Sequence, residues 1–298
     1  MSKNTKAYIM LILATLFWAG NFTIGKFAYT EDVPPYSLAF FRWILVWIIL
    51  LPFTYKEISK IKAEVKNNLS LFFILGFTSV GIFSAFTYNA LNHTQVINAS
   101  LFNTAIPVSI ILVCFLLKIE KTNIFQIIGV ILSFTGVIVI ITKANFEILK
   151  NLDFNKGDIT MVVAMFSWAL YSSLLKKQKY EISQISLLQV LITFGLIFLI
   201  PVYFIEYQIG FRIKIDTSFI LILSYVVLLP GLASFILWIK GISMIGANRS
   251  GVFLHLMPIF SAVMAMIFFN EKFMFYHILG ACFIITGILL SNKKVQNA

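Results

Sequence analysis

Charged residues are scarce in this chain of 298 residues, since only 12% of them are Asp, Glu, Lys or Arg. Soluble domains carry about 25% charged residues, because water must solvate their surface. Here 60% of the residues are hydrophobic instead. The composition therefore predicts an all-α integral membrane protein. A membrane-spanning helix takes roughly 20 apolar residues, so ten spans would fill about 200 positions and leave no separate soluble domain.

Cysteine and the common catalytic motifs are also missing or rare. Cys114 and Cys282 lie inside apolar runs, at a spacing that suggests neither a disulfide framework nor a metal site. Neither the H-E-x-x-H motif of zinc hydrolases nor the G-x-S-x-G motif of serine hydrolases occurs. Gly20 to Lys26 has the spacing of a phosphate-binding loop, but Phe27 stands where Ser or Thr would hold magnesium. We expect no enzymatic activity, no bound metal and no cofactor.

Acidic residues are absent from the interior of the apolar runs. All twelve Asp and Glu residues fall in loops or at the predicted ends of spans. Proton-coupled carriers and aspartyl intramembrane proteases both depend on carboxyl groups buried within spans. The sequence therefore argues against both mechanisms.

The apolar runs themselves predict ten membrane-spanning helices. In the first half of the chain they cover residues 7–27, 35–53, 69–88, 96–117 and 123–142. In the second half they cover residues 158–175, 185–203, 218–239, 251–269 and 273–290. The longest predicted linkers are residues 56–66 and 143–156.

Basic residues outnumber acidic ones, with a formal net charge of +11. They lie between apolar runs and form no basic stripe, so we expect no nucleic-acid partner. Of the 23 Lys and Arg residues, 15 flank the spans on one side of the membrane and 7 on the other, while Arg42 lies within a span. Cytoplasmic loops carry the excess of cations. The chain is therefore expected in the cytoplasmic (inner) cell membrane, with both termini in the cytoplasm.

A repeat with a constant shift of 151 residues relates the two halves of the chain. The matched pairs are Pro107 with Pro258, Glu120-Lys121 with Glu271-Lys272, Gly129 with Gly280, and Thr135-Gly136 with Thr286-Gly287. Each copy, residues 1–147 and residues 148–298, has five predicted spans, so the second copy enters the membrane from the opposite side. Two inverted five-helix repeats characteristically place a substrate site near the bilayer midplane between them.

The chain resembles members of the drug/metabolite transporter superfamily of the EamA type, with two EamA-like repeats. The resemblance covers nearly the whole chain and rests on the Trp18-Ala19 pair, on Pro34-Pro35 followed by Arg42, and on segments 158–171, 107–136 and 258–287. It implies ten transmembrane helices in two inverted five-helix repeats around a central cavity. It also implies export or exchange of small metabolites, with amino acids and related compounds as the expected class.

Two helix faces are candidates for the wall of that cavity. Trp18 and Asn21 lie three residues apart, as do Trp168 and Tyr171 in the second repeat, so each pair shares one helix face. Aromatic walls with a polar orienting group are typical of small-molecule sites. Aromatic packing between the two halves is the alternative interpretation.

Arg42 lies seven residues inside the second predicted span, about 10 Å deep, where an unpaired charge is costly. Either it anchors an anionic group of a substrate, or it is a structural arginine that snorkels or binds between helices. Its apolar repeat counterpart, Leu191, favours the structural role.

Other polar and kinking residues within the spans complete the set of candidates. His255 binds substrate or relays a proton, or it is a hydrogen-bonded structural histidine. The remaining cavity candidates are Tyr88, Asn98, Asn103 and Trp238. Pro107, Pro230 and Pro258 are candidate helix kinks, because proline frees a backbone carbonyl one turn earlier.

These features predict a secondary transporter that exports or exchanges small amphipathic metabolites by alternating access. Its expected partners are a small-molecule substrate and the lipid bilayer. A channel or facilitated-diffusion pore is the alternative. Without carboxylates in the spans we expect uniport or exchange, with proton coupling through His255 as the alternative. Monomer and homodimer both fit the sequence.

The predicted orientation can be tested with reporters fused after Lys294. We expect green fluorescent protein to fluoresce there and alkaline phosphatase to be inactive, because the richer side of the cation bias is cytoplasmic. The opposite pair of results would place the C-terminus outside the cell and contradict the orientation.

Overall fold

A computed structural model describes the chain apart from residues 1, 95–98, 100–101, 146, 152–154, 178–181, 270–271, 273 and 294–298. All secondary structure in the described residues is helical, as the composition predicts. In the first half the α-helices are α1 (Lys3–Thr30), α2 (Pro35–Asn67), α3 (Leu69–Gly76), α4 (Phe83–His93), α6 (Ile106–Leu116) and α7 (Ile124–Ile141). The short α8 (Glu147–Lys150) precedes α9 (Lys156–Leu174), α10 (Gln184–Gln208), α11 (Thr217–Val226), α12 (Ser234–Ile245), α13 (Ala247–Gly251), α14 (Leu256–Phe269) and α15 (Phe275–Ser291).

Several of these helices join into longer rods. The π-helical segments η1 (Phe77–Ile82) and η3 (Val227–Ala233) connect α3 to α4 and α11 to α12. The 3-10 segment η2 (Leu175–Lys177) extends α9, and the 3-10 segment η4 (Val252–His255) connects α13 to α14. The two π-helical segments begin 150 residues apart, so they occupy equivalent places in the two repeats.

Length and composition make this helical bundle a multi-pass membrane protein. Six described helical stretches are long and apolar enough to cross a membrane. They are Lys3–Thr30, Pro35–Asn67, Leu69–His93, Ile124–Ile141, Gln184–Gln208 and Thr217–Ile245, and shorter apolar helices are α6 and α15. Large apolar side chains such as Phe115 and Leu289 lie exposed on the outside of the bundle, where lipid would solvate them.

Helix α2 departs from the sequence prediction. The predicted linker 56–66 is wrong, because α2 continues to Asn67. This stretch holds strong helix formers without Gly or Pro, and it buries Ile61 against the bundle while its lysines and Glu64 are exposed. The charges therefore mark where the helix leaves the apolar zone, not where it ends.

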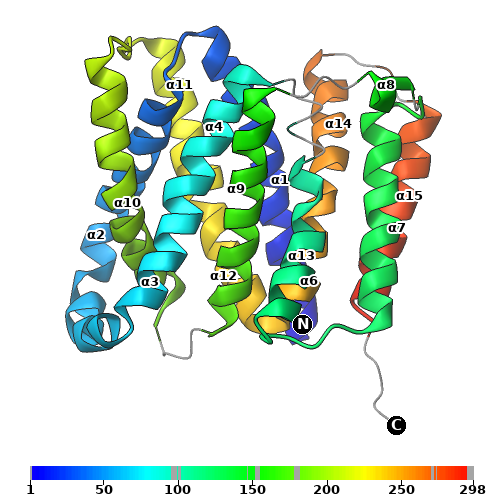
Figure 1. Ribbon diagram of the computed structural model, residues 1–298, viewed down its shortest axis with the longest axis horizontal. Coiled ribbons are helices and arrows are strands. Elements are labelled where there is room, and N and C mark those ends of the chain that lie inside the picture. The colour runs from blue at the N-terminus through cyan, green and yellow to red at the C-terminus, as the bar shows by residue number, and fades with distance from the viewer. Residues whose placement is uncertain are drawn as a thin grey trace.

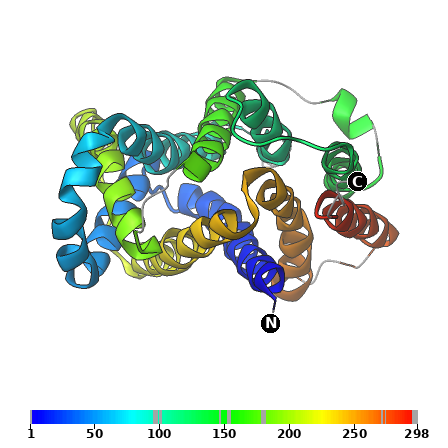
Figure 2. The same cartoon turned by 90° about the horizontal axis from the view of Figure 1, so that it is seen from below.

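The helices are arranged so that the two halves interlock. Figures 1 and 2 show α2 and α10 together at one edge of the bundle and α7 and α15 together at the other. Between these edges, α1 packs against α12 and α14, while its repeat counterpart α9 packs against α4 and α6. Helix α1 begins and α15 ends at the same end of the bundle, the lower end in Figure 1.

The α7–α15 pair is held by close backbone contact at four glycines. A Cβ atom on Gly129 would lie 2.5 Å from the carbonyl oxygen of Gly287, and one on Gly136 would lie 2.5 Å from that of Gly280. Small residues of this kind let helices approach closely in membranes, where packing replaces the hydrophobic effect between helices. The sequence repeat relates the two contacts to each other, because a shift of 151 residues takes Gly129 to Gly280 and Gly136 to Gly287.

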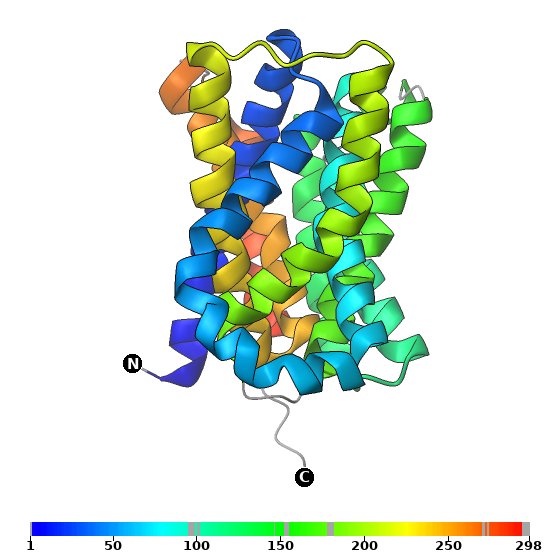
Figure 3. The same cartoon turned by 90° about the vertical axis from the view of Figure 1, so that its left-hand side faces the viewer.

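The α2–α10 pair, which Figure 3 views face on, is fastened at both ends by carboxylates. Glu206 in the last turn of α10 accepts hydrogen bonds from the backbone nitrogens of Tyr36 (3.2 Å) and Ser37 (2.6 Å) at the start of α2. At the other end, Glu57 of α2 accepts from the backbone nitrogen of Ser183 (2.7 Å) and the hydroxyl of Ser186 (2.6 Å) at the start of α10. Each helix thus caps the positive N-terminal end of the other.

The cap formed by Glu206 should contribute measurably to stability. We expect Glu206→Gln to lower the free energy of unfolding by about 2 kcal/mol, because the buried charged acceptor is replaced by a neutral amide. Thermal unfolding of the detergent-solubilised protein measures this as a lower Tm. Glu31→Gln, at an exposed position just after α1, is the matched control and should leave Tm unchanged. Equal Tm values for both variants would contradict a stabilising role of the cap.

Candidate functional site

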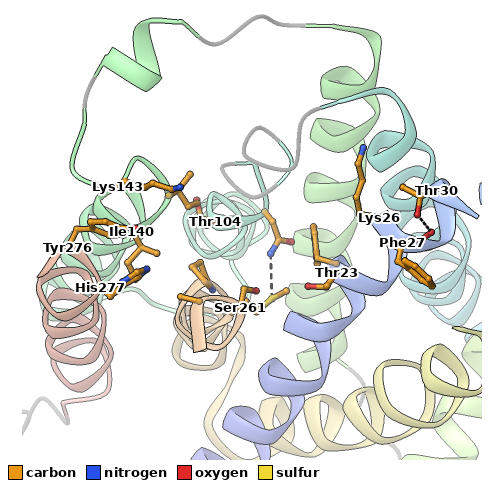
Figure 4. Close-up of a pocket in the computed structure, with 16 residues that line it drawn as sticks. Thr23, Lys26, Phe27, Thr30, Thr104, Ile140, Lys143, Ser261, Tyr276 and His277 are labelled. Carbon is orange, nitrogen blue, oxygen red and sulfur yellow. Dashed lines mark hydrogen bonds between the residues drawn. The ribbon is translucent and has the colours of Figure 1, made fainter. Parts of the chain in front are cut away.

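A cavity of about 520 Å³ lies at the end of the bundle away from the chain termini. Small-molecule sites typically measure about 300–1,000 Å³. Residues from α1, α14 and α15, from the end of α7 and from the chain before α6 surround it (Figure 4). Its lining residues are Phe22, Thr23, Lys26, Phe27, Thr30, Asn103, Thr104, Ile140, Ile141, Lys143, Met257, Pro258, Ser261, Ala262, Tyr276 and His277. We call this space the wide cavity.

The charged groups in the wide cavity are basic. Figure 4 shows Lys26 on α1 and Lys143 beyond the end of α7 on opposite sides of the cavity, with Ser261 of α14 between them. The Lys26 ammonium donates a hydrogen bond to the carbonyl oxygen of Leu91 (3.0 Å), a neutral acceptor that leaves its charge uncompensated. No Asp or Glu is among the described residues that line the cavity. Its potential is therefore positive.

A smaller space of about 20 Å³, the deep pocket, lies against the wide cavity and shares Phe22, Asn103 and Met257 with it. The other lining residues of the deep pocket are Trp18, Asn21, Arg42, Phe83, Thr87, Ile106, Trp168 and Leu254. One water molecule needs a space of about 10–15 Å³, so the deep pocket can hold a small polar group.

A buried polar chain flanks the deep pocket. The Nη1 atom of Arg42 donates to the hydroxyl of Tyr88 (2.9 Å), which in turn donates to the side-chain oxygen of Asn21 (2.9 Å). The guanidinium carbon also lies 4.8 Å from the centre of the Trp43 ring, a cation–π distance. Arg42 is only 4% exposed, and its Nε has no hydrogen-bond partner among the described residues. The hydroxyl of Thr87, on the wall of the same pocket, is likewise without a partner there.

Beneath the deep pocket, aromatic rings from both halves form a floor, which we define as Trp18, Trp168, Tyr171, Phe235 and Trp238. The Trp18 ring lies 5.1 Å from Trp168 and 5.3 Å from Trp238, both in edge-to-face geometry. Its indole nitrogen donates to the carbonyl oxygen of Pro230 in η3 (3.1 Å). Trp168 is 1% exposed and Tyr171 and Trp238 are fully buried, so the floor is sealed.

His255 lies apart from both spaces in a fully buried site. Its Nε2 lies 2.8 Å from the carbonyl oxygen of Thr104, and its Nδ1 lies 2.6 Å from the hydroxyl of Ser133. Because a carbonyl only accepts, Nε2 carries a proton. The ring ties η4 to α7 and to the chain before α6, an arrangement in which both nitrogens are already used.

The structure brings together part of the predicted set. Trp18, Asn21, Arg42, Asn103 and Trp168 line the deep pocket, and Tyr88 lies one hydrogen bond behind them. Tyr171, Trp238 and His255 line neither of the two spaces. Asn98 lies outside the described residues.

Each of the three predicted kink prolines lies either at the start of an α-helix or inside a π-helical segment. Pro107 stands in the first turn of α6 and Pro258 in that of α14, where it also lines the wide cavity, and Pro230 lies within the π-helical segment η3.

Sequence reasoning missed several lining residues. Lys26 and Lys143 are among the seven Lys and Arg residues on the predicted cation-poor side of the membrane, yet they line the wide cavity. Phe22 lies four residues after Trp18 on the same helix face, a spacing that could have identified it. Ser261, three residues after Pro258, offered a similar signal. No group of three or more His, Cys, Asp or Glu in the described residues could hold a metal ion.

Comparison with known proteins identifies the family. The sequence pattern of the EamA-like transporter family matches residues 5–142 and 155–293. An uncharacterized transporter of Archaeoglobus fulgidus is 29% identical over 98% of this chain and 99% of its own length. The uncharacterized transporter YyaM of Bacillus subtilis is 23% identical over 99% and 96%. The uncharacterized inner membrane transporter YicL of Salmonella typhimurium is 20% identical over 97% and 96%.

A solved crystal structure shares the fold, with a TM-score of 0.73 at 16% identity over 97% of both chains. The resemblance read from the sequence to the drug/metabolite transporter superfamily is thereby confirmed. The chain belongs to the EamA-like transporter family, as a membrane transporter and not an enzyme.

Proposed function

We propose that the protein is a secondary transporter that exports or exchanges small amphipathic metabolites, such as amino acids and related compounds, by alternating access. The observation that carries this proposal is the wide cavity, which both halves line, with the deep pocket at its inner side and the sealed aromatic floor below. A carrier needs a site that is open to one side of the membrane and closed to the other. The sealed floor also favours a carrier over a channel, which would need a continuous path.

The inverted relation between the two halves implies a second state of the proposed transport cycle, in which the site opens to the cytoplasm. We propose that ten helical rods cross the membrane as two inverted five-helix repeats, with both termini in the cytoplasm. Three features support this arrangement: the exchanged glycine contacts of α7 and α15, the reciprocal caps of α2 and α10, and the equivalent packing of α1 and α9. In this orientation the wide cavity faces the outside of the cell. If the halves exchange conformations, an equivalent cavity opens to the cytoplasm.

We further propose that the cycle runs as uniport or exchange. The described lining of the wide cavity and of the deep pocket contains no carboxylate, and both nitrogens of His255 are bonded within the protein. Proton-driven carriers use intramembrane acidic groups or histidines that bind and release protons as access alternates. Transport would then follow the gradient of the substrate itself.

Reconstituted vesicles test the carrier proposal. We expect saturable counterflow of a labelled substrate found by screening amino acids and related metabolites, and no ion conductance. Asn103→Leu should slow counterflow by at least about tenfold, the loss expected for one polar contact on the cavity wall. Asn67→Leu, at an exposed position at the end of α2, is the matched control and should transport normally. Ion conductance without counterflow would establish a channel instead.

Cysteine labelling tests which residues line the cavity and from which side it opens. In a background of Cys114→Ala and Cys282→Ala, we expect Ser261→Cys and Thr23→Cys to react with a membrane-impermeant maleimide added outside intact cells. Ser234→Cys should stay unlabelled, because Ser234 is fully buried beside α1. Equal labelling of all three positions, or labelling only from the cytoplasmic side, would contradict the assigned cavity.

A further inference from the structure

Arg42 is a buried cation that no described residue neutralises. The ion pairs in the part of the chain that the structure describes are Lys150 with Glu147 and Lys214 with Asp216, both at the surface. Arg42 instead donates to a neutral phenol and stacks on an indole ring. Unpaired charges at this depth are costly, so they mark a ligand, a pathway or a structural pair. The hydrogen bond of Arg42 to the Tyr88 hydroxyl provides no structural counter-ion.

The described carboxylates are used elsewhere and cannot supply that counter-ion. Glu57, Glu120, Asp158, Glu206 and Asp216 accept hydrogen bonds at helix starts. Glu147 pairs with Lys150, and Glu31, Asp32 and Glu64 are exposed. The acidic groups of this protein therefore stabilise its helices, and none of those described reaches the deep pocket.

The surroundings of Arg42 are shaped for a small acceptor group. Gly231 of η3 leaves room for the guanidinium, since a Cβ there would lie 3.3 Å from its Nε atom. The side chains of Asn21 and Thr87 line the same pocket and offer further donors. The deep pocket, at about 20 Å³, admits one water-sized group such as a carboxylate oxygen, while the adjoining wide cavity of about 520 Å³ has room for the rest of a molecule.

We propose that Arg42 binds an anionic group of the transported molecule, so that the substrates are small organic anions with an apolar or aromatic body. This inference rests on the proposed function and narrows its substrate class. The aromatic walls of Phe22, Phe83 and Trp168 would contact the body of the molecule. A charge-assisted hydrogen bond to the guanidinium would fix its head, and the substrate would complete the charge balance that the protein leaves open.

The charged residues that line the wide cavity also favour an anionic substrate. Lys26 and Lys143 stand in it, and its described lining contains no carboxylate to receive an ammonium group. A basic cavity with low-dielectric walls concentrates anions and repels cations. An anion without an amino group should therefore bind more tightly than the matching zwitterion, and the matching cation should bind least.

The experiment measures binding to the purified full-length chain by isothermal titration. Four probes share one ring system and differ in charge: indole-3-propionate, indole-3-propionamide, tryptophan and tryptamine. Benzoate and octanoate are added as anions with other bodies. We expect at least one anion to bind, and the indole series to bind in the order anion, zwitterion, amide, amine. Arg42→Gln should weaken anion binding by at least about thirtyfold, whereas amide binding should change little.

Matched variants protect this test from a folding defect. Arg212→Gln removes the same charge from an exposed loop and should bind like the unmodified protein. Arg42→Lys keeps the charge without the planar donor pair and should retain part of the anion preference. If Arg42→Gln does not fold, two results still test the proposal: the rank order in which the unmodified protein binds the probes, and the anion preference of Arg42→Lys. Amide or amine binding at least as tight as anion binding, or no binding of any anion, would overturn the proposal.

Counterflow in vesicles separates this inference from the carrier proposal. If anions bind in an Arg42-dependent manner but no compound undergoes counterflow, the anion site stands and the carrier mechanism fails. If an amine or amide undergoes counterflow while the anions neither bind nor move, the carrier stands and the anion site fails.

Discussion

Backbone polar groups inside a membrane must find partners within the protein, and several helix starts of this bundle find them in carboxylates. Glu206 and Glu57 fasten α2 and α10 to each other, and Glu120 accepts from the backbone nitrogens of Ala247 (2.9 Å) and Asn248 (3.1 Å) at the start of α13. Asp158 serves its own helix and also accepts from the hydroxyl of Thr94. This use of acidic groups explains both why helices from distant parts of the chain stay in register and why the described lining of the cavities is free of negative charge.

The caps of the α2–α10 pair follow the sequence repeat. Glu57 and Glu206 lie 149 residues apart, as do the serines Ser37 and Ser186 that donate to them. One end of the α2–α10 pair is therefore fastened in the same way as the other. At the opposite edge the glycine contacts of α7 and α15 repeat in the same fashion. The two pairs thus frame the inner helices, and they also contribute to the site, since Arg42 lies on α2 and Tyr276 and His277 lie on α15.

The sequence could predict the helical membrane fold and the family, because a long apolar run has few other stable forms. It could also predict that Trp18, Asn21 and Trp168 lie near one another, since helical spacing and the repeat act together. Tyr171 shows the limit of this reasoning: it shares a helix face with Trp168, but the ring packs at full burial in the floor. Helix spacing gives a direction, whereas distance from the cavity depends on how neighbouring helices cross. The roles of Lys26 and Lys143 escaped prediction for a related reason, because a charge at a helix end looks the same whether it faces a headgroup or a cavity.

Sealing the aromatic floor leaves three donors without acceptors among the described residues. They are the indole nitrogens of Trp168 and Trp238 and the hydroxyl of Tyr171. Each buried donor without a bond costs about 1–3 kcal/mol. If the floor parts in the proposed transport cycle, water or a polar group of the substrate can reach these atoms and recover part of that cost. In that cycle the rings that close the path would also reduce the free-energy difference between the closed and the open state, and a seal built from aliphatic side chains alone would be harder to break.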